Sequence, residues 1–191
     1  AIERLVHAGR LERVARGVFA TPDAAPLRTA LAIGGSGAAL SHHTAAALWG
    51  LRRQRPGETI HVTDPIGHAP AHGGITWHQS RTLLPVDHSG LPVTSPLDTL
   101  THLAGELPAL RFSMTAAVRL GLVSLDERSV ATVARRGRRH WGLCLEECLA
   151  GAWSGIEATY WRGLVMSDLP LPELNPPVST AVGVRHPDAV R

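Results

Sequence analysis

The chain has 191 residues, 44% of them hydrophobic, and contains no apolar run long enough to span a bilayer. Its basic side chains other than histidine are all arginine, and the lack of lysine excludes Walker A loops, lysine Schiff bases and lysine-dependent nuclease sites from this sequence. Two cysteines are too few for a disulfide framework, so we expect a soluble cytoplasmic protein, and a net charge of +3 permits nucleic-acid binding without requiring it.

The N-terminal segment has a pattern that is typical of DNA-binding domains. Residues 1–8 look like the end of a helix, and residues 10–20 alternate like a short hairpin with a tight turn at Gly17. A helix followed by a basic hairpin is the arrangement of a winged helix-turn-helix, whose helix enters the major groove while the wing lies on phosphates. A solvated hairpin with ordinary surface arginines is the alternative. The arginines of this hairpin are Arg10, Arg13 and Arg16.

Residues 38–51, AALSHHTAAALWGL, give the clearest helical pattern in the chain. Ser41 occupies the expected N-cap position, and the apolar residues form one stripe, so we interpret this helix as the centre of a core. His42 and His43 are adjacent on it and point about 100° apart, which argues against their sharing one metal ion.

Two strands with alternating patterns are predicted at residues 59–63 and 75–80. They would place His61 and His78 on neighbouring strands, with His68 and His72 in the loop between them. A zinc site is conceivable there, but neither a cysteine pair nor an H-x3-H spacing supports it, so no metal site is predicted.

The second half of the chain is mainly helical in pattern. A strand at 91–94 precedes a helix capped by Ser95, and further helices are expected at 107–120, 124–135 and 141–150. The run RRGRRH at 135–140 suits phosphate contact, an acidic partner protein or a solvated loop. On the last of these helices, His140, Cys144 and Cys148 share a face, where we prefer buried cysteines to part of a zinc site.

The C-terminal segment begins with a capping box of Ser154 and Glu157. A proline-rich extended stretch at 169–177 and a strand at 178–184 follow. The chain starts with Ala1 inside a helical pattern and stops in a strand-like segment, so we expect the natural sequence to continue at one or both ends.

Four segments, in order, resemble the AbiEi-like antitoxin proteins of high-GC bacteria: GRLERVARGVFA, AALSHHTAAALWGL, TIHVT with WHQSR, and GLPVTSPLDTLTHLA. The family pattern has a wing ending in R-G-V-Y/F, an L-S-H-x-S/T-A-A helix, a strand similar to VHRS, and a G-I/L-P-V-T-x-P-x-x-T-L segment. The resemblance covers roughly residues 1–105. It implies a winged-helix repressor of its own operon, paired with a nucleotidyltransferase-like toxin.

By this resemblance the DNA-binding residues lie on the end of the recognition helix and on the wing, and double-stranded DNA is the expected partner. Winged-helix repressors often form homodimers, although nothing in the sequence identifies a two-fold interface. The first two helices of the motif are missing. The residues that would contact DNA are Arg4, His7, Arg10, Arg13 and Arg16.

Residues 154–178 resemble the opening helix and strand of Vsr-type nucleases of the PD-(D/E)XK class, which many AbiEi-like proteins carry at the C-terminus. Glu157 matches the helix glutamate and Asp188 the metal-binding aspartate of that class. Such a nuclease binds Mg²⁺ through these carboxylates, and it needs a further acidic residue and usually a lysine to activate water. Neither follows Asp188 in this chain.

The sequence therefore predicts an α+β protein that acts as a DNA-binding autoregulator and antitoxin, without a cofactor and more as a regulator than as an enzyme. A metal-dependent endonuclease and a protein-interaction module without DNA specificity are the alternatives. The expected divisions are a winged-helix remnant at 1–22, an AbiEi-like α/β region at 23–105, a helical region at 106–153 and a truncated nuclease-like segment at 154–191.

Overall fold

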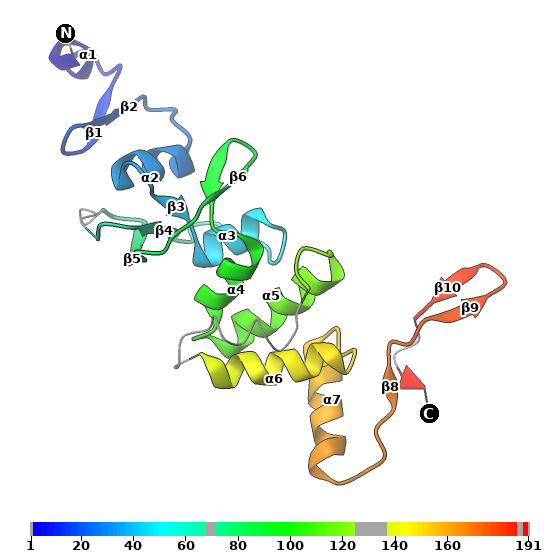
Figure 1. Cartoon of the computed structure of the whole chain (residues 1–191). Helices are drawn as coiled ribbons and strands as arrows, with labels where there is room; N and C mark the ends of the chain where they lie inside the picture. Colours follow the sequence, from blue (N-terminus) through cyan, green and yellow to red (C-terminus); the bar gives the residue numbers. More distant parts are fainter. Residues whose placement is uncertain (1, 68–71, 125–136, 187–188, 191) are drawn as a thin grey trace. The chain divides into compact units, whose positions relative to one another are not determined.

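The computed structural model describes residues 2–67, 72–124, 137–186 and 189–190 (Figure 1). The fold is α+β, as predicted, with helices and mixed sheets alternating along the chain. The chain divides into two compact units. Unit 1 comprises Ala1–Trp49 and Arg53–Thr99, and unit 2 comprises Gly50–Arg52 and Leu100–Arg191. The finer four-part division made from the sequence stays a prediction.

The N-terminal helix and hairpin form as the pattern predicted. Helix α1 (Ile2–His7) is followed by the antiparallel strands β1 (Glu12–Ala15) and β2 (Val18–Ala20). The ladder is irregular between Arg13 and Ala15, and Gly17 makes the turn with a φ of +78°. Helix α2 (Pro26–Gly34) then packs against both strands of the hairpin.

A five-stranded mixed sheet, in the order β5-β4-β3-β7-β6, is the framework of unit 1 (Figure 1). Strands β4 and β5 pair in parallel, as do β3 and β7, whereas the other two pairs are antiparallel. Strand β6, which pairs with β7 across a turn at Ser89 and Gly90, was not predicted from the sequence. The strands are β3 (Ala39–Leu40), β4 (Ile60–Asp64), β5 (Ile75–Gln79), β6 (Val86–His88) and β7 (Leu91–Val93).

The single helix predicted over residues 38–51 is wrong at its N-terminal end. Its first part is β3, which lies in the middle of the sheet, and only α3 (His42–Leu48) is helical. Backbone pairing of Leu40 with two neighbouring strands outweighs the helix propensity of the alanines around it. The interpretation as a core is confirmed, because Leu40 and Ala45 belong to the buried cluster of the sheet.

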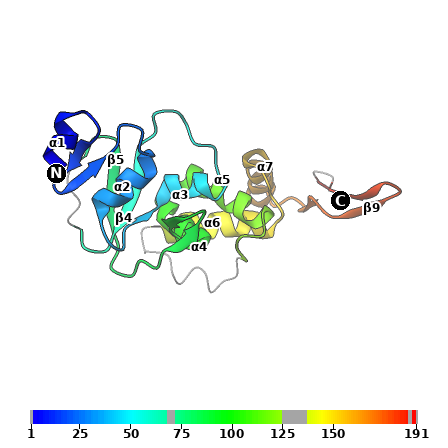
Figure 2. The same ribbon diagram turned by 90° about the horizontal axis from the view of Figure 1, so that it is seen from above.

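The two faces of the sheet differ in chemistry. Val62 and Trp77 pair across β4 and β5 on one face, which α2 covers; Figure 2 shows α2 against β4. There a Cβ added at Gly34 would lie 3.1 Å from Trp77 and 2.7 Å from the Cβ of Ala38, so this close approach requires glycine. Because side chains alternate along a strand, His61 and His78 lie on the opposite face.

Helices α5 and α6 pack together in unit 2 and bury Leu110, Met114, Trp141 and Cys144. Among the described helices, none combines the length and the apolar composition that a membrane crossing would need. The elements are α4 (Pro96–Leu103), which begins before the unit boundary, α5 (Leu107–Arg119), α6 (Arg138–Leu149), α7 (Gly155–Met166), β8 (Glu173–Leu174), β9 (Val178–Thr180), β10 (Gly183–Arg185) and β11 (Ala189–Val190).

A buried ion network fixes α5, α6 and α7 to one another. Glu147, 2% exposed, accepts hydrogen bonds from Nε and Nη2 of Arg111 at 2.7 and 2.9 Å and from Nε of Arg162 at 2.6 Å. Burial raises the pKa of this carboxyl, but the two guanidiniums outweigh burial and hold the pKa below its usual value. The network satisfies a charge that would otherwise be costly to bury.

The serine side chains predicted as N-caps at Ser95 and Ser154 do cap their helices. Ser95 Oγ accepts from the backbone N–H of Asp98 at 3.1 Å, and Ser154 Oγ accepts from that of Glu157 at 3.2 Å. The helix predicted at 124–135 lies almost entirely outside the described residues.

The single strand predicted at 178–184 is wrong, because β9 and β10 form a hairpin there. Thr180 Oγ1 donates to the Gly183 carbonyl at 2.6 Å, and Gly183 has a φ of +112°.

Candidate functional site

The five residues predicted to contact DNA all lie on the α1–β1–β2 segment and are all exposed. Arg4 and His7 are on α1, and Arg13 is on β1. Arg10 lies two residues before β1, and Arg16 directly follows this strand. The Nε of Arg13 donates to the Ala15 carbonyl at 3.4 Å across the irregular part of the ladder. A short helix and a basic hairpin thus follow one another in this segment, as predicted.

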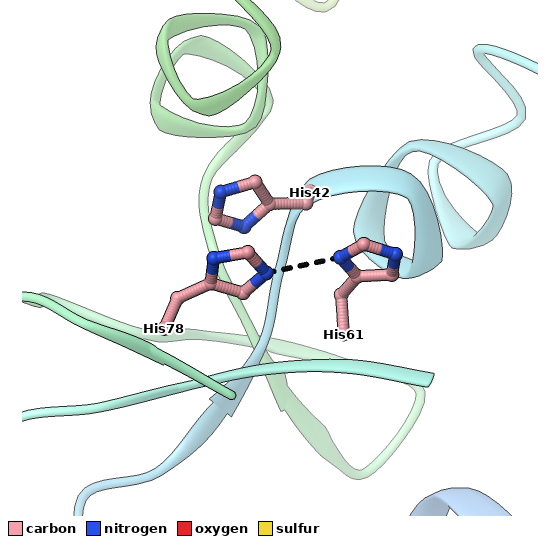
Figure 3. Close-up of side chains that lie close together, drawn as sticks. All are labelled: His42, His61 and His78. Carbon is pink, nitrogen blue, oxygen red and sulfur yellow. Dashed lines mark hydrogen bonds between the residues drawn. The ribbon is translucent and has the colours of Figure 1, made fainter. Parts of the chain in front are cut away.

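A second constellation was not assembled from the sequence. His42 from α3, His61 from β4 and His78 from β5 converge on one face of the sheet, as Figure 3 shows. Each is half-buried, and one ring nitrogen from each lies within 4.8 Å of the other two. We name these three residues the histidine cluster.

Within the histidine cluster the rings contact one another directly. His61 Nδ1 and His78 Nε2 lie 3.0 Å apart and share a hydrogen bond, drawn as the dashed line in Figure 3. The His42 ring stacks on the His78 ring at a centroid distance of 3.5 Å and an interplanar angle of 15°. His43, the other histidine of the pair considered from the sequence, meets the His61 ring edge-on at 5.2 Å.

The backbone holds His42 in an uncommon conformation. Its φ is +49°, in the left-handed region that non-glycine residues seldom adopt. Ser41 occupies the expected N-cap position, but its side chain makes no capping hydrogen bond. Instead, Ser41 Oγ, which is fully buried, lies 3.0 Å from His42 Nδ1 and orients the ring. The prediction that this serine caps the helix through its side chain is therefore wrong.

The register of β4 and β5 and one hydrogen bond to α3 position His61 and His78 in the cluster. In the parallel ladder, His78 pairs with Thr63, two positions beyond His61 on the same face. The backbone N–H of His61 donates to Thr44 Oγ1 at 2.8 Å, which ties β4 to α3. The alternation of the two strands was a signal for the His61–His78 pair, whereas the arrival of His42 depends on the sheet topology.

Among the described residues, His140, Cys144 and Cys148 on α6 do not bring their ligand atoms close enough together to hold one metal ion. Burial raises the pKa of Cys144 to about 12 and also raises that of Cys148. His140 Nδ1 donates to the Ala104 carbonyl at 3.0 Å. The interpretation as buried cysteines is confirmed for Cys144, whereas Cys148 is half-buried.

Glu157, a predicted catalytic residue of the nuclease alternative, is fully engaged locally. Its Oε2 accepts from the Trp153 backbone N–H at 2.7 Å and from Asn175 Nδ2 at 2.6 Å, and its Oε1 accepts from Ser154 Oγ at 2.9 Å. Burial raises the pKa of this carboxyl, but these hydrogen bonds hold it below its usual value. Asp188, its expected partner, lies outside the described residues.

Comparison with known proteins identifies a family. The model of the AbiEi antitoxin C-terminal domain matches residues 37–140, which is 104 of the 191 residues. The match includes three of the four segments noted in the sequence, ends before the nuclease-like segment, and begins after the basic hairpin. No curated protein matches the sequence.

Among solved structures, the crystal structure of the RV2827C protein from Mycobacterium tuberculosis is similar, with 20% sequence identity and a TM-score of 0.47. The alignment covers 76% of this chain and 63% of that one, so this chain spans less than two thirds of the other protein's length. The family match alone decides the classification: the chain belongs to the AbiEi antitoxin family.

Proposed function

We propose that this protein represses its own operon by binding DNA and that it is the antitoxin of a nucleotidyltransferase-like toxin. Membership of the AbiEi antitoxin family supports the antitoxin role. The observation that carries the DNA-binding part is the exposed basic surface of α1 and the β1–β2 hairpin, which precedes the matched domain and is separated from it by α2. We call this surface, defined by Arg4, His7, Arg10, Arg13 and Arg16, the basic wing.

The charge and exposure of the basic wing support phosphate contact. Four of its residues are permanently charged arginines on a stretch that holds only two acidic residues, Glu3 and Glu12. Arg13 lies on β1, and Arg10 and Arg16 flank this strand in the chain; exposed guanidiniums bind phosphate oxygens in a fixed fork. Each phosphate contact releases counterions, so binding should weaken steeply with salt.

The test is a binding titration of the natural full-length protein with a fluorescent duplex from its own upstream region and with a scrambled duplex. We expect saturable binding that prefers the upstream duplex. Arg13→Gln should weaken binding to both duplexes several-fold, because a phosphate contact carries no sequence information. Arg81→Gln, which removes an exposed arginine outside the basic wing, should leave the affinity unchanged.

The same titration separates this proposal from the two alternatives. Repeated with Mg²⁺ and analysed on a denaturing gel, it should leave the DNA intact. Cleavage that is lost in Glu157→Ala would assign the protein to the nucleases instead. Weak binding without preference, equally sensitive to Arg13→Gln and Arg81→Gln, would leave the basic wing as an ordinary surface and favour a protein-interaction module.

The antitoxin role is tested in cells by co-expressing the full-length protein with the nucleotidyltransferase-like toxin encoded beside it. We expect growth to be restored. A variant with glutamine at positions 10, 13 and 16 should also restore growth, because we assign counteraction of the toxin to the region after the winged helix. Failure of the wild type to restore growth would contradict the antitoxin role and leave the DNA-binding proposal standing.

A further inference from the structure

We propose that the histidine cluster of His42, His61 and His78 binds one divalent transition-metal ion of the zinc class. The three side chains come from three separate elements of unit 1 and bring their ring nitrogens within 4.8 Å of one another. The proposal does not depend on DNA binding, because the cluster shares no residue with the basic wing.

The donor set determines the class of ion. Imidazole nitrogen suits zinc and its neighbours, whereas Mg²⁺ and Ca²⁺ prefer oxygen ligands. Three histidines with a remaining position for water form a common open zinc arrangement. The half-buried position of the rings leaves room for that solvent ligand, since none of the three histidines is fully buried.

The distances lie close to those of such a site. With Zn–N bonds of about 2.0–2.1 Å and tetrahedral angles, ligand nitrogens lie roughly 3.3 Å apart. The His61–His78 nitrogens are 3.0 Å apart, and the three candidate ligand nitrogens all lie within 4.8 Å of one another. Closing the cluster around an ion therefore shortens no nitrogen–nitrogen separation by more than about 1.5 Å, and side-chain rotations can supply this change.

Binding would change two contacts. A metal ion lies in the plane of each ring that it binds, so the stacked His42 ring, 3.5 Å above His78, has to turn out of the stack. In the hydrogen bond between His61 and His78, the donating ring has to carry its proton on its other nitrogen, leaving a lone pair for the ion. Neither change moves the backbone of β4 or β5.

The ion would cross-link three elements of unit 1. It would link the parallel pair β4 and β5 to the start of α3, where His42 already holds a φ of +49°. Anything that binds only the folded state stabilises it by mass action. Metal binding should therefore raise the unfolding temperature of the protein.

The experiment titrates the full-length protein with Zn²⁺ in competition with a chromophoric chelator, and with Co²⁺ while visible absorbance is recorded. We expect one ion per chain and a tetrahedral Co²⁺ spectrum. With free Zn²⁺ about 100-fold above its Kd, the unfolding temperature should rise by roughly 5–10 °C. His42→Asn, His61→Ala and His78→Ala should each weaken Zn²⁺ binding at least 10-fold, the effect expected even of outer-shell partners.

Two variants keep the test decisive. His42→Asn removes an imidazole while retaining a residue that tolerates a positive φ, so it should fold even if the strand variants do not. His72→Ala removes a histidine of the same unit outside the cluster and should keep the wild-type affinity within twofold. No Zn²⁺ binding by the wild type, or an affinity that His42→Asn leaves unchanged, would overturn the proposal.

Discussion

The two units each gather three ionisable side chains from separate elements, but the chemistry of the two gatherings differs. In unit 2, Glu147 lies between Arg111 and Arg162, so opposite charges satisfy one another at hydrogen-bond distance. In unit 1, the histidine cluster brings together three side chains of one kind. Opposite charges make a self-contained structural network, whereas repeated donors of one kind offer their lone pairs to a common ligand.

The strongest test of this contrast removes the buried carboxylate. Glu147→Ala should destabilise the protein by about 3 kcal/mol, because it leaves two guanidiniums without their partner. We place the effect at the lower end of the range for buried pairs since Arg111 and Arg162 are 27% and 29% exposed. Urea unfolding measures the change.

The neighbouring glutamate provides the matched control. Glu146 is 62% exposed and lies 3.9 Å from Arg162, so Glu146→Ala should change stability by less than about 0.5 kcal/mol. Equal losses of stability in Glu147→Ala and Glu146→Ala would contradict a structural network around Glu147.

The stability that Glu147 contributes should depend on pH. Because the pKa of Glu147 is lowered on folding, its contribution is present at neutral pH and is lost as the pH falls through the folded-state value. Glu147→Gln should therefore lose less stability than the wild type on acidification, as measured by urea unfolding at a series of pH values.

A smaller effect is expected on the other face of the unit 1 sheet. Gly34→Ala places a Cβ 2.7 Å from that of Ala38 and 3.1 Å from Trp77, so α2 must shift from the strands that carry His61 and His78. We expect a loss of about 1–2 kcal/mol, measured by thermal unfolding. Gly73→Ala, where the added Cβ meets no atom within 4 Å, should stay within about 0.5 kcal/mol. Equal losses of stability in Gly34→Ala and Gly73→Ala would contradict the close packing of α2 against this face of the sheet.

Local patterns predicted the elements whose structure depends on local chemistry. The basic hairpin follows from its alternation and from Gly17, and the helix starts at Ser95 and Ser154 follow from their N-cap serines. The alanine-rich segment failed because Leu40 pairs with strands distant in sequence, an interaction that no local propensity contains.

The two candidate sites also differ in how far the sequence predicted them. The basic wing was visible because its arginines lie within one short segment. The histidine cluster was only partly predicted. The sequence placed His61 and His78 on neighbouring strands without assigning them to one face, and His42 was compared only with its sequence neighbour His43. Glu147 was overlooked although it lies three residues after Cys144, on the buried side of α6, because adjacent glutamates usually indicate a solvated surface.

The proposed function depends most on whether the basic wing contacts DNA phosphates. The direct measurement is the slope of log K against log salt concentration for the upstream duplex, with the wild type and with a variant carrying glutamine at positions 10, 13 and 16. If the three arginines each contact a phosphate, the slope should become shallower by about 2 to 3. An unchanged slope would contradict binding through the basic wing.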